Sequence, residues 1–233
     1  MFFDVLIVVI FILTIAISLY QNQIYKLAVW KLIIMIFVGA VVSCWGIFFF
    51  GYLEDGYWSH WSFSGCVFFV PIAFWLLSKL IKEPYWVLME FCGPICALFF
   101  MLIKLNCLRA GCCWGRLLFT TNSGQEVYFP SPLFESIAGF ILCLILLKLQ
   151  KKETNRGKIA PYFLVMFGTS RFIFYLLRDG WKPLRPFNAV GLFLPTGLAW
   201  SFLILIAGVI WMRKAKKIFS GKVSCYNKLE KDE

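Results

Sequence analysis

The chain has 233 residues, of which 61% are hydrophobic, 19% aromatic and 15% charged. Soluble domains are roughly 45–50% apolar and about 25% charged, so an ordinary soluble enzyme, a small secreted disulfide module and a disordered tail are excluded. The formal net charge of +11 could suggest nucleic acid, but the basic residues lie between long apolar stretches, which is typical of membrane topology.

Seven apolar stretches are long enough to cross a bilayer, which takes about 20 residues as an α-helix. They are too long and too continuously apolar for the strands of a membrane barrel. In chain order the expected helices cover residues 3–19, 29–50, 61–81, 84–108, 131–149, 160–178 and 190–212. The sequence therefore predicts an all-α polytopic membrane protein. Residues 1–212 would form a single seven-helix membrane domain, and residues 213–233 a basic cytoplasmic tail.

The basic residues assign an orientation, because cytoplasmic segments carry an excess of Lys and Arg. One alternating set of segments holds most of them: Lys26, Lys31, Lys79, Lys82, the five bases from Lys148 to Lys158, and those from Arg213 onward. This predicts an N-terminus outside and a C-terminus in the cytoplasm, where the tail would face anionic lipid and not nucleic acid. The opening MFFD has no positive charge and no cleavage site follows, so we expect a retained first helix. The polar outer segment 112–131 is expected to be a loop.

Four ionisable residues are expected in the outer half of the membrane, where a charge is costly and indicates function. Lys104 and Glu135 lie near the outer ends of their helices, and Arg171 lies roughly 17 Å into the sixth helix at 1.5 Å per residue. Arg171, Tyr175 and Arg178 share one helical face. Because cations outnumber carboxylates, and guanidinium groups bind phosphate in a bidentate manner, we expect a site for a phospholipid headgroup. The alternative is that these charges only pair between helices or extend to the interface.

Five of the nine cysteines lie in apolar helices and need no function beyond packing: Cys44, Cys66, Cys92, Cys96 and Cys143. Cys107, Cys112 and Cys113, here named the outer cysteine cluster, lie together at the outer end of the fourth helix. Cys107 could form a disulfide with either of the other two. A structural zinc site takes four ligands at familiar spacings, which C-x4-C-C and a distant His60 do not supply. We therefore expect no metal site and no cofactor, and we interpret His60 as a solvated loop residue.

The segment Glu90–Arg116, EFCGPICALFFMLIKLNCLRAGCCWGR, resembles the signature region of the prolipoprotein diacylglyceryl transferases. That region has an acid, a proline and then G-R-x-G-N-F-x-N-G-E or, in small divergent members, G-R-x-G-C-F-x-A-G-C-C-Y-G. Glu90 matches the acid and Pro94 the proline. Lys104 takes the place of the signature arginine, and Cys107 matches the divergent cysteine.

Four further motifs resemble the same family and occur in the same order. SFSG (62–65) stands where the family has S-F-H-G-G, and FPSPLFES (129–136) resembles H-P-S-Q-L-Y-E. GTSRFIFYLLR (168–178) resembles G-x-x-R-F-x-x-E-F-x-R, and TGLAWS (196–201) resembles G-Q-x-x-S. The resemblance covers about residues 38–205 and implies the family's fold of seven helices with the same orientation.

The resemblance implies a chemistry, in which the diacylglyceryl group of phosphatidylglycerol moves onto the lipobox cysteine of a prolipoprotein at the bacterial plasma membrane. Arg171 would hold the phosphate, with Lys104 as the second cation and Arg178 in support. Glu135 would orient a cation or help the thiol to lose its proton. Further substrate-binding residues implied by the match are Tyr175, Ser64, Gly65, Gly111 and Glu90.

The sequence also departs from the family pattern. Two family histidines are Ser64 and Phe129 here, and the glutamate of the sixth helix is Tyr175. The cationic positions are thus kept, whereas several groups that could handle protons are replaced. Two alternatives therefore stay open: a non-catalytic phospholipid-binding relative, and a membrane thiol-redox protein that uses the outer cysteine cluster.

Overall fold

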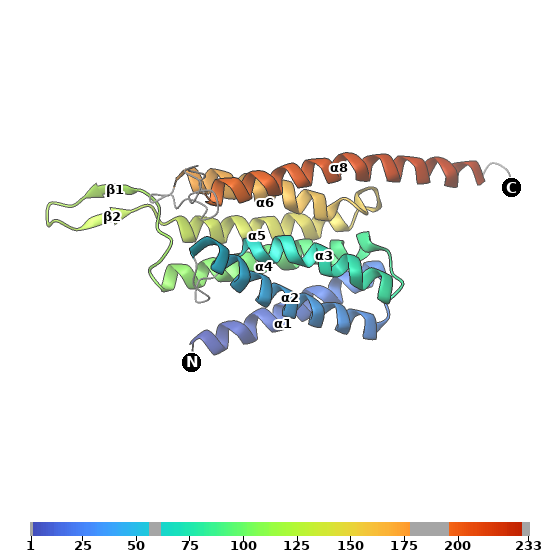
Figure 1. Cartoon of the computed structure of the whole chain (residues 1–233), viewed down its shortest axis with the longest axis horizontal. Coiled ribbons are helices and arrows are strands. Elements are labelled where there is room, and N and C mark those ends of the chain that lie inside the picture. Colours follow the sequence, from blue (N-terminus) through green and yellow to red (C-terminus); the bar gives the residue numbers. More distant parts are fainter. Residues whose placement is uncertain (1, 56–61, 178–195, 230–233) are drawn as a thin grey trace.

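The computed structural model describes residues 2–55, 62–177 and 196–229. In this part of the chain, long helices run alongside one another as a bundle, and a β-hairpin projects from one end (Figure 1). The helices are α1 (Phe2–Tyr25), α2 (Val29–Asp55), α3 (Ser64–Leu80), α4 (Tyr85–Arg109), α5 (Ser131–Gln150), α6 (Ile159–Leu176) and α8 (Thr196–Leu229), with a short 3-10 turn η1 (Glu153–Asn155) before α6.

Among the described residues, five helices are long and apolar enough to cross a membrane: α2, α4, α5, α6 and the first part of α8. Large apolar side chains such as Phe37, Trp75 and Phe140 are exposed on the outside of the bundle, as expected for surfaces that face lipid. The prediction of a helical membrane protein is therefore confirmed. Within the described residues, α1 is not among the five spans and α3 has only 17 residues. Seven crossings and their orientation consequently stay predictions.

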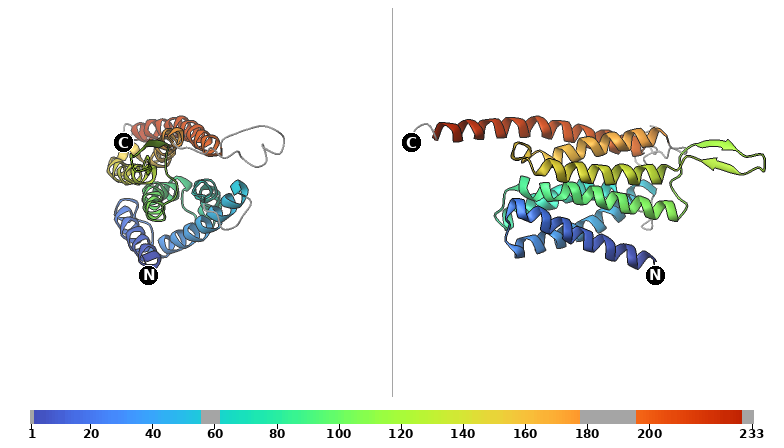
Figure 2. Two further views of the ribbon diagram at one scale, coloured as in Figure 1. Left: turned by 90° about the vertical axis from the view of Figure 1, so that its left-hand side faces the viewer. Right: turned by 180° about the vertical axis from the view of Figure 1, so that it is seen from behind.

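Helix α4 lies in the middle of the bundle, where it packs against α1, α3, α5 and α6 (Figure 2). A helix that is apolar on every side belongs in an interior, and α4 carries just two charges before its last turn, Glu90 and Lys104. Leu88, Phe91 and Phe100 are almost completely buried. The position of α4 thus forces both of its interior charges to find partners on neighbouring helices.

Helices α2 and α3 approach each other at a pair of facing glycines. A Cβ atom on Gly65 would overlap the carbonyl oxygen of Gly46, and one on Gly46 would lie 2.8 Å from the carbonyl oxygen of Gly65. Small residues allow such close approach between membrane helices. The resemblance assigned Gly65 to substrate binding, whereas its contacts give it a packing role.

We expect Gly65→Ala to destabilise the protein by about 1–3 kcal/mol, because backbone atoms of α2 cannot move aside for the added methyl group. Thermal unfolding in detergent micelles would show a lower Tm. Gly39→Ala is the matched control, since its new Cβ would make an ordinary 3.4 Å contact with the Phe74 ring. Equal Tm values for the two variants, with the diacylglyceryl transfer that the resemblance implies lost in Gly65→Ala alone, would favour substrate binding instead.

The expected outer loop contains an antiparallel hairpin of β1 (Leu117–Thr120) and β2 (Glu126–Tyr128). The turn between the strands is closed by Thr121, whose hydroxyl accepts a hydrogen bond from the backbone N–H of Gln125 at 3.0 Å. Gly124 supplies a φ of 80° there, a conformation that glycine adopts without steric cost. The loop prediction was therefore wrong for these residues, and a small sheet accompanies the helices.

Helix α8 has 34 residues and continues to Leu229. Residues 213–219 read RKAKKIF, and Ala, Lys and Arg are good helix formers. The secondary structure therefore does not change at residue 213, where we predicted that the tail begins. The predicted start of the last helix, at residue 190, lies outside the described residues.

Candidate active site

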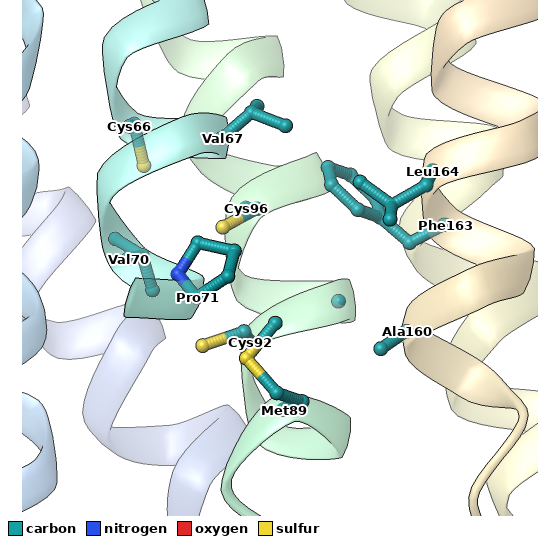
Figure 3. Close-up of a pocket in the computed structure, with 11 residues that line it drawn as sticks. Cys66, Val67, Val70, Pro71, Met89, Cys92, Cys96, Ala160, Phe163 and Leu164 are labelled. Carbon is teal, nitrogen blue, oxygen red and sulfur yellow. The ribbon is translucent and has the colours of Figure 1, made fainter. Parts of the chain in front are cut away.

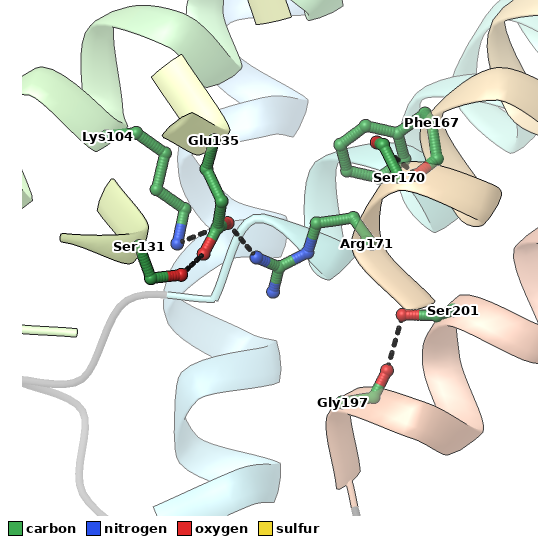
Figure 4. A network of polar contacts seen from close by, with 8 residues as sticks. All are labelled: Lys104, Ser131, Glu135, Phe167, Ser170, Arg171, Gly197 and Ser201. Atoms are coloured by element: carbon green, nitrogen blue, oxygen red, sulfur yellow. Dashed lines mark hydrogen bonds and ion pairs between the residues drawn. The ribbon is translucent and has the colours of Figure 1, made fainter. Parts of the chain in front are cut away.

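Helices α4, α5 and α6 bring Lys104, Glu135 and Arg171 together around one carboxylate (Figure 4). The Lys104 Nζ lies 2.9 Å from the Glu135 Oε2, and the Arg171 Nη1 donates a hydrogen bond to the same oxygen. The other oxygen, Oε1, accepts a hydrogen bond of 3.0 Å from the Ser131 hydroxyl. We call these four residues the charge cluster.

The start of α5 explains how Glu135 is aimed. Pro130 precedes the helix and Pro132 occupies its first turn, which suits proline because its ring fixes φ and no N–H is needed there. Ser131 and Glu135 are four residues apart and therefore lie on the same face of the helix. Both side chains are buried against α4 and α6.

An aromatic ring lies beside the two cations. The Phe100 ring centroid is 5.6 Å from the Lys104 Nζ and 5.5 Å from the Arg171 Cζ. Phe100 is itself held by edge-to-face packing on Phe167 of α6. Cations within about 6 Å of a ring are attracted by its quadrupole, so Phe100 helps to keep both basic side chains facing Glu135.

The charge cluster has one more positive than negative charge. The Glu135 side chain is fully buried and that of Lys104 is 7% exposed, whereas that of Arg171 is 18% exposed. A guanidinium has five N–H donors, and within the described residues only the Arg171 Nη1 hydrogen-bonds to an acceptor, Glu135. The arrangement can therefore take an anion at Arg171 without breaking its internal contacts.

The other predicted site residues lie in different surroundings. The Tyr175 ring packs on the backbone of Gly197 in α8, where a Cβ would overlap it. Ser64 is half-buried at the start of α3, and Gly111 follows the end of α4 with a φ of 66°. Arg178 and His60 lie outside the described residues.

Glu90 is at the far end of α4, about 21 Å along the helix from Lys104 at 1.5 Å per residue. Its carboxylate accepts hydrogen bonds from the Tyr25 hydroxyl at 2.5 Å and the Ile159 backbone N–H at 3.5 Å. The backbone carbonyl oxygen of Glu90 accepts a hydrogen bond from the Gln150 side-chain amide at 2.7 Å. Glu90 thus joins α1, α5 and α6 to α4, which is a structural role.

We expect Glu90→Ala to lower the Tm in detergent, because the half-buried Tyr25 hydroxyl and the buried Ile159 N–H would lose their acceptor at up to about 1–3 kcal/mol each. Any diacylglyceryl transfer of the kind that the resemblance implies should change less than about twofold per folded molecule, a change worth well under 1 kcal/mol. Tyr25→Phe, which removes one of the same hydrogen bonds, should lower the Tm by a smaller amount. A normal Tm together with lost transfer in Glu90→Ala would instead support the substrate-binding role that the resemblance implied.

An apolar pocket lies between the Glu90 end of α4 and the charge cluster, and it is bounded by α3, α4 and α6 (Figure 3). Several sulfur atoms line it, from Cys66, Cys92, Cys96 and Met89. None of the described residues that line it is charged. The pocket is therefore suited to apolar groups, and its cysteines act as small apolar side chains.

Cys107 lies in the last turn of α4, Cys112 and Cys113 follow the end of that helix, and all three are free cysteines. Partial burial, reinforced by the neighbouring Cys113, raises the pKa of the Cys112 thiol. A raised pKa disfavours the thiolate, which is the reactive form of a redox-active cysteine. This environment does not favour the thiol-redox interpretation.

Ser131 was not among the predicted site residues, although the sequence carries a signal for it. Ser131 precedes Glu135 by four residues within FPSPLFES, the spacing at which helical side chains meet. The fold and the charge cluster together define a multi-pass membrane protein with a buried, cation-rich site between three helices.

Comparison with known proteins identifies the family. The chain matches the family model of the prolipoprotein diacylglyceryl transferases over residues 3–213, and it belongs to this family. A phosphatidylglycerol–prolipoprotein diacylglyceryl transferase 2 of Clostridium perfringens is 32% identical over 118 residues, which cover 46% of this chain and 43% of the relative. The transferase of Idiomarina loihiensis is 24% identical over 163 residues, 67% of this chain and 60% of its own. That of Teredinibacter turnerae is 25% identical over 193 residues, 72% and 67% respectively. The chain thus spans about half the length of the first two of these relatives.

Proposed function

We propose that the chain is a transferase that moves the diacylglyceryl group of phosphatidylglycerol onto the lipobox cysteine thiol of a prolipoprotein. The charge cluster is the observation that carries this proposal. It offers two cations, buried Lys104 and partly exposed Arg171, against one carboxylate, at a depth where a phospholipid headgroup would be the available anion. The names of the curated relatives supply the lipid and the acceptor.

The reaction exchanges one bond to carbon for another. The substrate sulfur attacks the glyceryl carbon that carries the phosphate, and a C–S bond forms as the C–O bond breaks. The bonding electron pair leaves on the phosphate oxygen, so glycerol phosphate departs with an added negative charge. The thiol proton is released, and the overall products are the thioether-linked lipid and glycerol phosphate.

The charge cluster fits the demands of this step. A phosphodiester carries one negative charge, which the excess charge of the cluster neutralises. Arg171 is the more exposed cation and would bind the phosphate through N–H donors other than the Nη1 group that contacts Glu135. Lys104 would add a second positive charge close to the leaving oxygen. Fixed cations aimed at developing negative charge are among the strongest contributions to catalysis.

Glu135 acts through the two cations. Its Oε2 lies between Lys104 and Arg171 and offsets their repulsion, while Ser131 fixes its other oxygen. With Ser64 and Phe129 where the family has histidine, the substrate thiol would ionise in the positive field of the cluster. Positive neighbours lower the pKa of a thiol and so favour the reactive thiolate.

We further propose seven membrane crossings, with the hairpin end of the bundle outside a bacterial plasma membrane. The hairpin and the start of α1 lie at one end, and α8 extends from the other (Figure 1). The basic loops that contain Lys26, Lys82 and Lys152 connect helices at the end opposite the hairpin, as the excess of cytoplasmic positive charge requires. The charge cluster would then lie in the outer half of the membrane.

A depletion experiment tests the proposed function in cells. In a bacterium whose own diacylglyceryl transferase has been depleted, expression of the chain is expected to restore the lipid-modified form of a reporter lipoprotein. The reporter with serine in place of its lipobox cysteine should stay unmodified. An unmodified reporter despite normal amounts of the chain in the membrane would contradict the proposal and favour a non-catalytic lipid-binding relative.

A further inference from the structure

The outer cysteine cluster has a geometry that its spacing in the sequence did not reveal. The Sγ atoms of Cys107, Cys112 and Cys113 all lie within 4.8 Å of one another. The backbone N–H of Cys112 donates to the carbonyl oxygen of Cys107 at 3.0 Å, so the chain folds back over the end of α4. Three side chains from two separate turns of backbone therefore converge on one point.

An unusual turn holds this convergence in place. Gly111 and Cys113 have φ angles of 66° and 64°, and a left-handed conformation is uncommon for a residue with a side chain. The Trp114 indole N–H closes the turn by donating to the Gly111 carbonyl oxygen at 2.9 Å. The Gly115 backbone N–H donates a hydrogen bond to the Phe129 carbonyl oxygen at 2.8 Å, which connects the turn to the base of the hairpin. The cysteines are thus carried by an anchored segment.

The distances suit a single soft metal ion. Thiolate sulfur lies about 2.3 Å from zinc, so sulfurs around one ion are roughly 4 Å apart. Thiolates select d10 cations such as Cu(I) and Zn(II) over the hard cations that prefer oxygen. Small side-chain rotations would bring the three sulfurs to that separation. Cys112 is exposed and the other two are half-buried, so an ion could enter from solvent.

The surroundings also suit the charge of such a complex. Three thiolates around a monovalent or divalent cation carry a net negative charge. Lys104 precedes Cys107 by about one helical turn, Arg109 lies between Cys107 and Cys112 in the sequence, and Arg116 follows Cys113 by three residues. These basic residues would offset the charge of the complex.

We propose that the outer cysteine cluster is a three-thiolate site for one thiophilic d10 cation, Zn(II) or Cu(I). Within the described residues, no histidine or carboxylate joins the three sulfurs, so Zn(II) would complete its four ligands with water and Cu(I) would be three-coordinate. Each bound thiol gives up its proton to solvent as the ion enters. The ion would fix the end of the helix that carries Lys104. The site does not depend on the transferase proposal.

Metal titration of the full chain tests the site. The protein in detergent micelles, reduced with a non-thiol reductant and freed of metal, would be titrated with Zn(II) and Cu(I) in separate arms. We expect one equivalent of at least one ion to bind and to protect three thiols from alkylation, counted by mass. Cys112→Ser should weaken binding at least about tenfold, because even the loss of a residue that only supports a ligand typically costs about 10–100-fold in metal affinity. The ion that binds more tightly identifies the class of metal.

Matched variants make the test decisive. Cys44, an exposed thiol on α2, provides the control, and Cys44→Ser should leave affinity and protection unchanged. Because Cys112 is exposed, its serine variant should fold normally, which Tm would verify. Binding of equal strength in Cys112→Ser would overturn the proposal. Two other results would also overturn the proposal. One is that neither ion forms a stoichiometric complex, and the other is that a disulfide forms within the cluster in place of the complex.

Discussion

Replacing Arg171 with alanine is expected to lower kcat/KM for diacylglyceryl transfer by about 10²–10³-fold, the usual cost of removing one donor to a developing negative charge. The side chain is partly exposed, and within the described residues it donates one hydrogen bond, to Glu135. Its loss removes the cation that is most accessible to a phosphate. Release of glycerol phosphate from phosphatidylglycerol micelles in the presence of a lipobox peptide would measure the effect.

Two further arginine variants sharpen this prediction. Arg171→Lys keeps the charge but loses the planar fork of donors, so its rate should lie between those of wild type and Arg171→Ala. Arg156 makes a partly exposed pair with Glu153 at 3.1 Å outside the membrane helices, and Arg156→Ala should leave transfer unchanged. Transfer at the wild-type rate in Arg171→Ala would show that the charge cluster does not bind the phosphate.

Replacing Glu135 with alanine is expected to cost about 3–5 kcal/mol of stability, the range measured when one partner of a buried ion pair is removed. Lys104 and Arg171 would then face each other without the carboxylate that now joins them. Transfer should be lost as well, because the cations would move apart. Thermal unfolding in detergent and the transfer rate would be measured on the same preparations.

A double variant tests whether Glu135 acts through Lys104. Lys104→Met removes one of the two cations, so Lys104→Met combined with Glu135→Ala should be more stable than the sum of the single losses predicts, as coupling between contacting residues requires. Glu153 pairs with Arg156 at 3.1 Å and its side chain is 83% exposed, so Glu153→Ala should cost less than about 1 kcal/mol. Strictly additive losses at Lys104 and Glu135 would contradict a shared charge cluster.

Much of the fold followed from apolar runs that charge and proline interrupt. The predicted spans 84–108 and 131–149 differ by one residue at most from α4 and α5. The hairpin was missed because each strand has only three or four residues, too few for an alternating pattern to stand out. The length of α8 was missed because the composition of a basic segment does not distinguish a solvated helix from a coil.

The charge cluster was predictable because burying a charge is costly and adjacent helices place Lys104, Glu135 and Arg171 at similar depth. The direction of each side chain was not predictable, since the depth of a residue in the membrane does not fix the rotation of its helix about the helix axis. Tyr175 shares a helical face with Arg171 by spacing, yet its ring packs on Gly197. The convergence of the outer cysteine cluster depends on a left-handed turn at Cys113 that its residue type does not predict.

The most direct test of the central claim is a transfer assay with the purified chain in phosphatidylglycerol micelles and a lipobox peptide. The account predicts that the peptide gains the mass of one diacylglyceryl group while an equal amount of glycerol phosphate is released. Neither product should form when a zwitterionic phospholipid replaces phosphatidylglycerol. An unchanged peptide mass, with phosphatidylglycerol still bound to the protein, would contradict the account and leave a lipid-binding protein without transferase activity.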